Sequence, residues 1–261
     1  MANVADAPRS PGCGMMKADN AIHVEELSYT YAVGPLALDR VSFDVAPGEC
    51  VGLVGPNGAG KTTLFLCLAG VYRRGGGSVR VVGLDPQRKE DRRQLPAHVG
   101  IVFQNSDDQL FNATVLDDVA FGPLNLGLPP DEVRSRVTEA LARVGLTGFE
   151  QRVPFHLSGG EKRRVALAGV LAMRPEVLLL DEPSIHLDPR GRREFIRLIQ
   201  ALEGTRLIAS HDLELILETC TRCLVLDRGQ VVAEGPARQL LADPALMDAH
   251  GLEVPYSLRG N

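Results

Sequence analysis

Short apolar runs, separated by glycine and proline, set the pattern of the chain from residue 22 onward. The runs Val41–Val45 and Cys50–Val54 have the length and composition of β-strands. Strand patterns return at Val177–Leu180 and Thr205–Ala209, each after a helical stretch. Strands that alternate with helices predict a parallel sheet with crossover connections, so we expect an α/β fold.

Glycine and proline also mark where helices and turns should lie. A helix should start near Gly60, and residues 130–144 form a capped amphipathic pattern that stops at Gly145. The glycines at 75–77 predict a turn that enters a hairpin, because glycine adopts positive φ freely. Residues 1–20 have no periodic apolar pattern and predict a mobile tail.

The composition is that of an ordinary globular chain that can bury a large core, with 44% apolar residues among 261. The 28 basic and 33 acidic residues give a net charge of -5, which offers no overall electrostatic footprint for nucleic acid. The sequence has neither an apolar stretch of about eighteen residues nor a secretory signal pattern. We therefore expect a cytoplasmic chain with no nucleic-acid partner and no direct membrane insertion.

The five cysteines should be reduced thiols in that compartment. Cys220 and Cys223 form a C-x-x-C pattern, which a redox pair, half of a zinc site, or two buried small side chains could each explain. A helical pattern gives way to a strand pattern at this point, and no second pair follows. Burial as small apolar residues is the favoured interpretation.

A glycine-rich segment between a strand pattern and a helix pattern carries the clearest chemistry. It fits G-x-x-x-x-G-K-[ST] and consists of Gly55, Pro56, Asn57, Gly58, Ala59, Gly60, Lys61, Thr62 and Thr63. Such a loop points backbone N–H groups at phosphate oxygens, at the positive end of a helix. Lys61 would bind the β- and γ-phosphates, and the Thr62 hydroxyl would bind Mg²⁺. The alternative is a plain glycine-rich turn, but the flanking strand and helix favour ATP binding.

Two acids follow the buried strand pattern at 177–180. Asp181 can hold Mg²⁺ through water, and Glu182 can act as general base toward the attacking water. An acid pair after a strand is a weak signal by itself. It becomes strong here because the carboxyl ends of parallel strands share one edge of the sheet with the glycine-rich loop.

The residues Leu157, Ser158, Gly159, Gly160 and Glu161 precede a helical pattern, so Ser158 is a candidate N-cap. Leu-Ser-Gly-Gly-Glu resembles the signature of the ATP-binding-cassette ATPases and precedes the acid strand as it does there. A mere cap would need no paired glycines. The resemblance implies that Ser158 to Glu161 close over the γ-phosphate held by a second nucleotide domain, in trans.

Three further positions match residues of that family. Tyr31 is similar to the aromatic residue that stacks on adenine, although Tyr29 is an alternative and either could belong to the core. Gln104 follows a strand pattern and matches the glutamine that senses Mg²⁺ and the attacking water. His211 matches the histidine that contacts the γ-phosphate; a lone histidine is more often structural, but the place of His211 after a strand pattern favours the functional role.

The segment after Glu182 departs from the family pattern. Asp188 matches the acid that crosses the dimer seam, but Ile185 and His186 stand where the family has small residues. His186 is either a titrating group at the seam or a tolerated side chain, and the second is favoured.

The family resemblance also implies an architecture. It predicts a P-loop NTPase (RecA-like) core with a mostly parallel sheet, an antiparallel β subdomain and an inserted helical subdomain at about 105–165. The nucleotide-binding domain would span 21–240, and 241–261 would form a C-terminal extension.

The stretch from Phe103 to Pro123 is similar to the glutamine loop of energy-coupling-factor importers, especially those for cobalt and nickel. The resemblance runs from about Ile22 to Leu258. Acids and an aromatic side chain in this stretch would line the groove that receives a helix of a membrane partner, unless the stretch is merely a solvated loop. These residues are Asp107, Asp108, Gln109 and Phe111.

The resulting hypothesis is an ATP hydrolase that powers an importer for cobalt or nickel ions, with ATP and Mg²⁺ as cofactors. Two identical subunits would work beneath a transmembrane coupling subunit and a substrate-binding membrane subunit, at the cytoplasmic face of the cell membrane. One alternative is a vitamin importer with two non-identical ATPase subunits; another is a soluble cassette ATPase that acts as a switch. The six histidines form no metal site by their spacing, so the transported substrate stays open.

Overall fold

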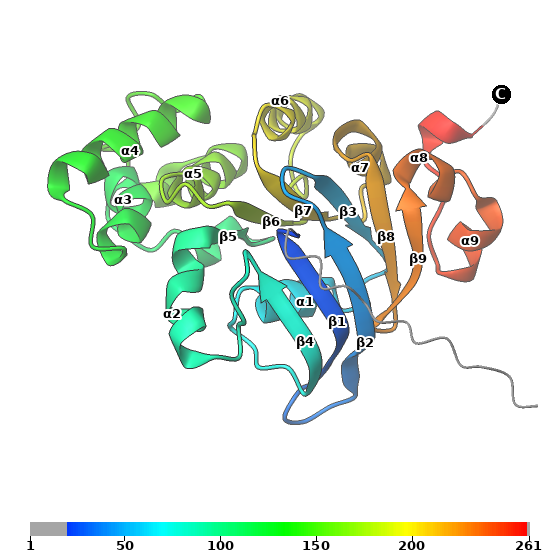
Figure 1. The fold of residues 1–261 in the computed structure, drawn as a ribbon. Helices are drawn as coiled ribbons and strands as arrows, with labels where there is room; N and C mark the ends of the chain where they lie inside the picture. Colours follow the sequence, from blue (N-terminus) through cyan, green and yellow to red (C-terminus); the bar gives the residue numbers. More distant parts are fainter. Residues whose placement is uncertain (1–19, 260–261) are drawn as a thin grey trace, which may run out of the picture.

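The computed structural model describes residues 20–259 (Figure 1), so the predicted tail at 1–20 lies outside the described residues except for Asn20. The strands are β1 (Ile22–Thr30), β2 (Leu36–Val45), β3 (Cys50–Val54), β4 (Gly76–Val81), β5 (Val99–Val102), β6 (Val177–Asp181), β7 (Thr205–Ala209), β8 (Arg222–Asp227) and β9 (Gln230–Pro236). The α-helices are α1 (Lys61–Leu68), α2 (Lys89–His98), α3 (Val115–Asn125), α4 (Pro130–Arg143), α5 (Gly159–Leu171), α6 (Pro189–Gln200), α7 (Leu213–Thr219), α8 (Ala237–Leu240) and α9 (Pro244–Ala249). Short 3-10 helices lie at η1 (Ser106–Asp108), η2 (Pro154–His156) and η3 (Tyr256–Leu258).

The larger sheet has the strand order β5-β6-β7-β3-β8-β9. Strands β5 to β8 of this sheet are parallel, and β9 pairs antiparallel with β8 at one edge. The central strand β3 lies between β7 and β8, with Leu53 opposite Ala209 on one side and Leu224 on the other. The predicted α/β fold with a mostly parallel sheet is confirmed.

The two faces of this sheet bury different layers. Leu178 and Leu180 of β6 belong to a core shared with helices α3 to α7. Val177 and Leu179 of the same strand belong to a second core, shared with α1 and a three-stranded antiparallel sheet of order β2-β1-β4. Successive residues of a strand point to opposite faces, so a strand that is apolar at every position must be covered on both. Figure 1 shows helices α3 to α7 above the large sheet, and α1 and the small sheet below it.

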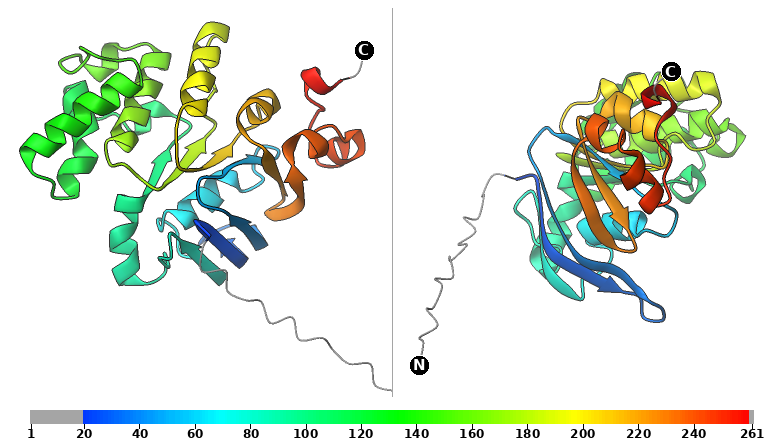
Figure 2. Two further views of the ribbon diagram at one scale, coloured as in Figure 1. Left: turned by 45° about the horizontal axis from the view of Figure 1, so that its top comes forward. Right: turned by 90° about the vertical axis from the view of Figure 1, so that its right-hand side faces the viewer.

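Helices α3, α4 and α5 pack on one another at the β5 end of the large sheet, as the first view in Figure 2 also shows. The side chain of Thr114 caps α3 by accepting a hydrogen bond from the backbone N–H of Asp117. The helix predicted at 130–144 is present as α4 and is amphipathic, with Val133, Val137 and Leu141 buried. The proposed boundaries of a helical subdomain and of a C-terminal extension stay predictions.

The glycines at 75–77 do not form the predicted hairpin turn. Gly76 and Gly77 lie inside β4, which pairs with β1. The pairing is irregular between Glu25 and Ser28 of β1, and a Cβ atom on Gly77 would fall on the backbone carbonyl oxygens of Glu25 and Glu26. Glycine is needed here because two backbones approach closely, and this requirement comes from the partner strand.

The four cysteines in the described part of the chain are all buried. Cys220 follows the end of α7 and Cys223 lies in β8, so the predicted burial of the C-x-x-C pair is confirmed. The Cys220 Sγ atom lies 3.6 Å from the Sγ atom of Cys50 rather than from that of Cys223. Within residues 20–259, no helix combines the length and apolar character needed to cross a bilayer.

Replacing Phe195 by Ala tests the helix-covered core. Phe195 of α6 is 1% exposed, so its loss should lower the free energy of unfolding by about 3–5 kcal/mol. Phe155 is 82% exposed, and its replacement by Ala should change the same quantity by less than about 0.5 kcal/mol. Urea unfolding of both variants measures the difference, and equal losses would contradict the packing described here.

Candidate active site

The loop between β3 and α1 has the backbone that the glycine-rich pattern predicted. Gly60 precedes α1 with a φ of 109°, in the left-handed region that glycine favours. A Cβ atom on Gly60 would lie 2.7 Å from the carbonyl oxygen of Ala37, so the position also lacks room for a side chain. The loop lines a cavity of 670 Å³ through Asn57, Gly58, Ala59, Gly60, Lys61, Thr62 and Thr63.

Lys61 is buried within this loop. Its Nζ atom donates hydrogen bonds to the carbonyl oxygens of Gly55 at 2.6 Å and Pro56 at 3.1 Å, and it lies 3.9 Å from Glu182 Oε1. Burial lowers the pKa of the Lys61 ammonium, and the charges of Glu182 and Asp181 oppose this shift. An ammonium in this position is poorly hydrated and near two acids, so an anionic ligand would gain strongly from binding it.

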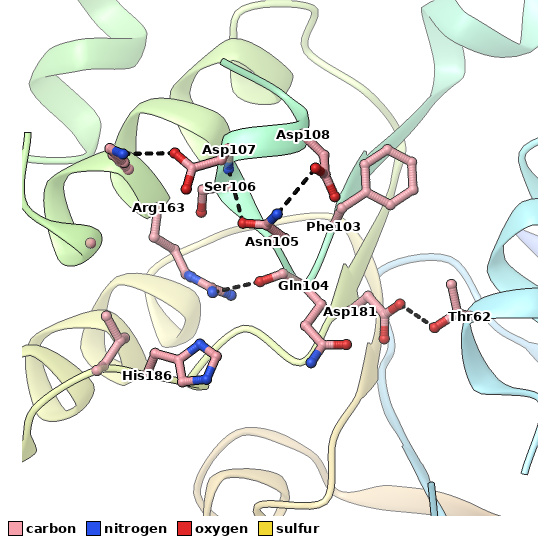
Figure 3. Close-up of a pocket in the computed structure, with 13 residues that line it drawn as sticks. Thr62, Phe103, Gln104, Asn105, Ser106, Asp107, Asp108, Arg163, Asp181 and His186 are labelled. Atoms are coloured by element: carbon pink, nitrogen blue, oxygen red, sulfur yellow. Dashed lines mark hydrogen bonds and ion pairs between the residues drawn. The ribbon is translucent and has the colours of Figure 1, made fainter. Parts of the chain in front are cut away.

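Thr62 and Asp181 provide oxygen atoms suited to a divalent cation. The Thr62 hydroxyl donates a hydrogen bond of 2.6 Å to Asp181 Oδ2 across the gap between α1 and β6 (Figure 3). Burial raises the pKa of Asp181, and the hydrogen bond from Thr62 works in the opposite direction. Gln104 lines a 540 Å³ cavity together with these two residues. A hydroxyl, a carboxylate and an amide in one cavity fit the oxygen ligands that Mg²⁺ prefers.

Glu182 is held on several sides directly after β6. Its backbone N–H donates to the carbonyl oxygen of Ala209 at 2.8 Å, and its φ of 48° lies in the left-handed region. The carboxylate accepts hydrogen bonds from the Ser210 hydroxyl at 3.2 Å and from the His211 backbone N–H at 3.1 Å. The His211 Nδ1 atom lies 2.7 Å from Glu182 Oε2. The acid after β6 and the histidine after β7 are therefore in direct contact.

Tyr31 lines the 670 Å³ cavity together with Lys61 and Glu182. Its hydroxyl and the Thr63 hydroxyl are 2.7 Å apart, and its ring is 40% exposed. Tyr29 instead stacks on Tyr72, with ring centroids 5.0 Å apart, and both pack against the core. This arrangement favours Tyr31 over Tyr29 as the ring that is available to a base.

The signature residues lie apart from Lys61. Ser158 caps α5, and its hydroxyl accepts from the Glu161 backbone N–H while the Glu161 carboxylate accepts from the Ser158 backbone N–H, a reciprocal capping box. Ser158, Gly160 and Glu161 line a cavity of 580 Å³ that also contains Asp188, the N-cap of α6. Lys61 lines the 670 Å³ cavity instead. The predicted site residues thus form two groups within one copy of the chain, and these groups meet at Gly159, which also lines the 540 Å³ cavity with Thr62 and Asp181.

His186 lies between these two groups. It lines both the 540 Å³ cavity and the signature cavity, with a φ of 61° that is unusual for a residue other than glycine. Figure 3 shows its ring at the edge of the cavity that contains Gln104. The bulky residue therefore lies next to both Gln104 and the signature residues, and its role as a titrating or tolerated side chain stays open.

Arg163 is a site residue that the sequence did not single out. It lies on α5 two residues after Glu161, is 4% exposed, and donates hydrogen bonds to the backbone carbonyl oxygens of Gln104 and Glu182. The available signal was an arginine close to the buried Val165 and Leu167 in the helical pattern of α5. Sequence alone gave no partner for this charge.

The comparisons with known proteins agree with this geometry. A family model described as ABC transporter matches residues 38–185, more than half of the chain. The energy-coupling factor transporter ATP-binding protein EcfA of Methanothermobacter thermautotrophicus is 48% identical over 238 residues, which cover 90% of this chain and 76% of that protein.

Two solved structures share the fold over most of their length. The structure of cbiO1 from Clostridium perfringens, part of the ABC transporter complex cbiONQ, matches with a TM-score of 0.78 and 37% identity, covering 88% of this chain and 94% of that one. The ATP-binding cassette MJ0796, in a dimeric post-hydrolysis state bound to ADP and Pi, matches with a TM-score of 0.75 and 25% identity, covering 83% and 98%. The chain therefore belongs to the ABC transporter family and is an ATPase subunit, related to the energy-coupling-factor type, whose hydrolysis of ATP is coupled to transport.

Proposed function

We propose that this chain powers an energy-coupling-factor importer for cobalt or nickel ions, as a homodimer on the cytoplasmic face of the membrane. The observation that carries the ATPase assignment is the contact network at one edge of the large sheet. The Lys61 Nζ atom lies 3.9 Å from Glu182 Oε1. The Thr62 hydroxyl forms a hydrogen bond with Asp181, and the His211 ring forms one with Glu182. These side chains come from three strand ends that are far apart in the sequence.

Each residue of this network has a proposed role. Lys61 leaves the loop carbonyls and binds the β- and γ-phosphates, while Tyr31 stacks on the adenine. Thr62, Asp181 and Gln104 hold Mg²⁺, which neutralises charge on the phosphates when bound. Glu182 accepts a proton from the attacking water, and His211 contacts the γ-phosphate.

The distribution of the phosphate-binding groups supports a second copy. Ser158 and Gly160 at the start of α5 line a different cavity from Lys61. One helix N-terminus at an exposed site contributes only about 0.3–1 kcal/mol to anion binding, so this group is weak by itself. Head-to-tail pairing would bring it over the γ-phosphate held by the other copy. The dimeric state of MJ0796 with ADP and Pi supports this arrangement.

An aromatic patch supports docking of a membrane partner near the start of α3. The Phe111 ring is 63% exposed and meets Phe121 edge to face, with centroids 5.0 Å apart. Gln109 was expected to line the groove for the partner helix. Its side chain instead accepts a hydrogen bond from the Phe103 backbone N–H and donates one to the Ile101 carbonyl oxygen. Phe111 and Phe121 are therefore the better candidates to pack against an apolar helix of a transmembrane coupling subunit.

The identity of the transported substrate is the most specific part of the proposal. Cobalt or nickel rests on the resemblance of the stretch from Phe103 to Pro123 to importers of those ions, and the similarity to cbiO1 of the cbiONQ complex is compatible with it. The rival is a vitamin importer in which this chain pairs with a non-identical ATPase subunit.

Replacing Lys61 by Ala should weaken ATP binding by about ten- to hundredfold, because a charge-assisted hydrogen bond contributes about 1.5–3 kcal/mol. Equilibrium binding of a fluorescent ATP analogue measures the loss. Lys89 is exposed on α2, away from the site, and its replacement by Ala provides a matched control with unchanged affinity. If the Lys61→Ala variant bound ATP with wild-type affinity, the assignment of this loop as the phosphate-binding site would be wrong.

Replacing Glu182 by Gln should abolish most turnover while leaving ATP affinity intact, because the amide cannot accept the proton of the attacking water. The variant should accumulate as a dimer with ATP and Mg²⁺, which size-exclusion chromatography with light scattering detects. A strictly monomeric variant, or one that turns over ATP at a near-normal rate, would falsify the proposed composite site.

The substrate proposal predicts that the chain copurifies with the membrane subunits of a metal importer. Reconstituted with those subunits, it should drive ATP-dependent uptake of radioactive nickel or cobalt, and the Glu182→Gln variant should not. Uptake of a vitamin without uptake of either metal, or copurification with a second, different ATPase subunit, would favour the rival importer.

A further inference from the structure

Arg163 of α5 is a buried cation with an unusual set of partners. The residue is 4% exposed, and burial lowers the pKa of its guanidinium, while the charge of Glu182 opposes this shift. Among the described residues, no carboxylate oxygen lies within 4.0 Å of its nitrogen atoms. A buried charge normally requires a paired acid, so the groups that replace the acid here need a physical explanation.

Backbone carbonyl groups from three functional segments solvate this charge. The Nη1 atom donates to the carbonyl oxygen of Glu182 at 2.9 Å, and Nη2 donates to that of Gln104 at 2.7 Å. A longer contact of 3.4 Å joins Nη2 to the carbonyl oxygen of Ile185. Figure 3 shows the guanidinium directed at the backbone of Gln104. The planar fork of arginine can bind two such oxygens at once, which a lysine ammonium reproduces poorly.

These contacts fix the peptide groups on both sides of the Glu182 side chain. The Glu182 backbone N–H is held by Ala209 of β7 at 2.8 Å, and its carbonyl is held by Arg163. The residue also has a positive φ of 48°, a conformation that persists only where surrounding bonds enforce it. The Glu182 N–H is thus held by the sheet, and the Glu182 carbonyl is held by α5, the helix that begins with the signature residues.

The neighbouring residue extends the same connection. Lys162 Nζ lies 2.7 Å from Asp107 Oδ1 in η1, the segment that follows Gln104. Two consecutive basic residues of α5 thus bind the segment from Gln104 to Asp107, and one of them also binds Glu182. Movement of α5 relative to the sheet would shift Gln104 and Glu182 together.

We propose that Arg163 is a positioning residue for ATP hydrolysis, which places the Glu182 carboxylate and the Gln104 side chain through their backbone carbonyl groups. Arg163 lines the 540 Å³ cavity with Gln104 and Asp181, and in this proposal it acts through the two carbonyl groups rather than by binding the nucleotide. The inference rests on the role of Glu182 proposed above, and it assigns to α5 a second task beside presenting the signature. The position of α5 then determines the rate of ATP hydrolysis, and a change in that position leaves the affinity for ATP unchanged.

The test is steady-state ATP hydrolysis by the Arg163→Met and Arg163→Lys variants. Arg163→Met should lower kcat by about ten- to hundredfold, since misplacement of a catalytic group by about 1 Å has effects of that size. The KM for ATP should change by less than about twofold, because no nucleotide contact is removed. Arg163→Lys, which keeps the charge and can bind one carbonyl, should retain an intermediate kcat and serves if the methionine variant does not fold.

A matched control separates positioning from stability. Arg206 of β7 also binds two backbone carbonyl oxygens, those of Ile199 and Leu202, at the sheet edge opposite the site. Arg206→Met should lower Tm but leave kcat unchanged at a temperature where the protein is folded. A loss of kcat in Arg206→Met equal to that in Arg163→Met, or an unchanged kcat in folded Arg163→Met, would overturn the proposal.

The background of Glu182→Gln provides the decisive comparison. If Arg163 acts largely through Glu182, Arg163→Met should lower the single-turnover rate of ATP hydrolysis much less in the Glu182→Gln background than in the wild type, with any remaining loss assigned to Gln104. Independent, multiplicative losses would show that Arg163 acts by another route. Normal turnover by Glu182→Gln alone would instead defeat the proposed role of Glu182, and the two failures are therefore distinguishable.

Discussion

Parallel pairing of β3 with β7 and β8, and of β7 with β6, is the constraint on which the site depends. Parallel strands end at the same edge, so the loop after β3, the acids after β6 and the histidine after β7 meet there without any local sequence relationship. Both faces of these strands are apolar and covered, so two hydrophobic cores hold the strands in place. The hydrophobic layers thereby determine the spacing between the charged groups.

Burial also removes the charged groups Lys61 and Asp181 of the site from water. Lys61 and Asp181 have pKa values shifted by burial in the directions that disfavour their charged forms. Each finds partial compensation nearby, in the loop carbonyls for Lys61 and in Thr62 for Asp181. A triphosphate with a divalent cation would supply the opposite charge to both, which explains why an ATPase tolerates this arrangement.

Sequence was sufficient for the parts whose signals are local. The strand patterns, the glycine-rich loop and the acids after β6 each occupy a short stretch, and the structure contains the strands where they were expected. The glycines at 75–77 were misinterpreted because their requirement comes from the bulge in β1, fifty residues away in the chain. Arg163 was missed for a similar reason, since its partners are backbone carbonyls of distant segments and leave no pattern of side chains. The boundaries of the subdomains and the individual catalytic roles remain predictions.

The left-handed backbone at Glu182 and His186 has a consequence for the evolution of this segment. Glycine would relax each position, where a non-glycine residue costs about 1–2 kcal/mol. A glycine at 182 would remove the carboxylate, so folding stability and activity make opposing demands on that position. No such demand is evident at His186, where glycine would both relieve the backbone and leave more room in the proposed contact with a second copy. If the proposed dimer forms, variation at this position would change how tightly its two subunits close.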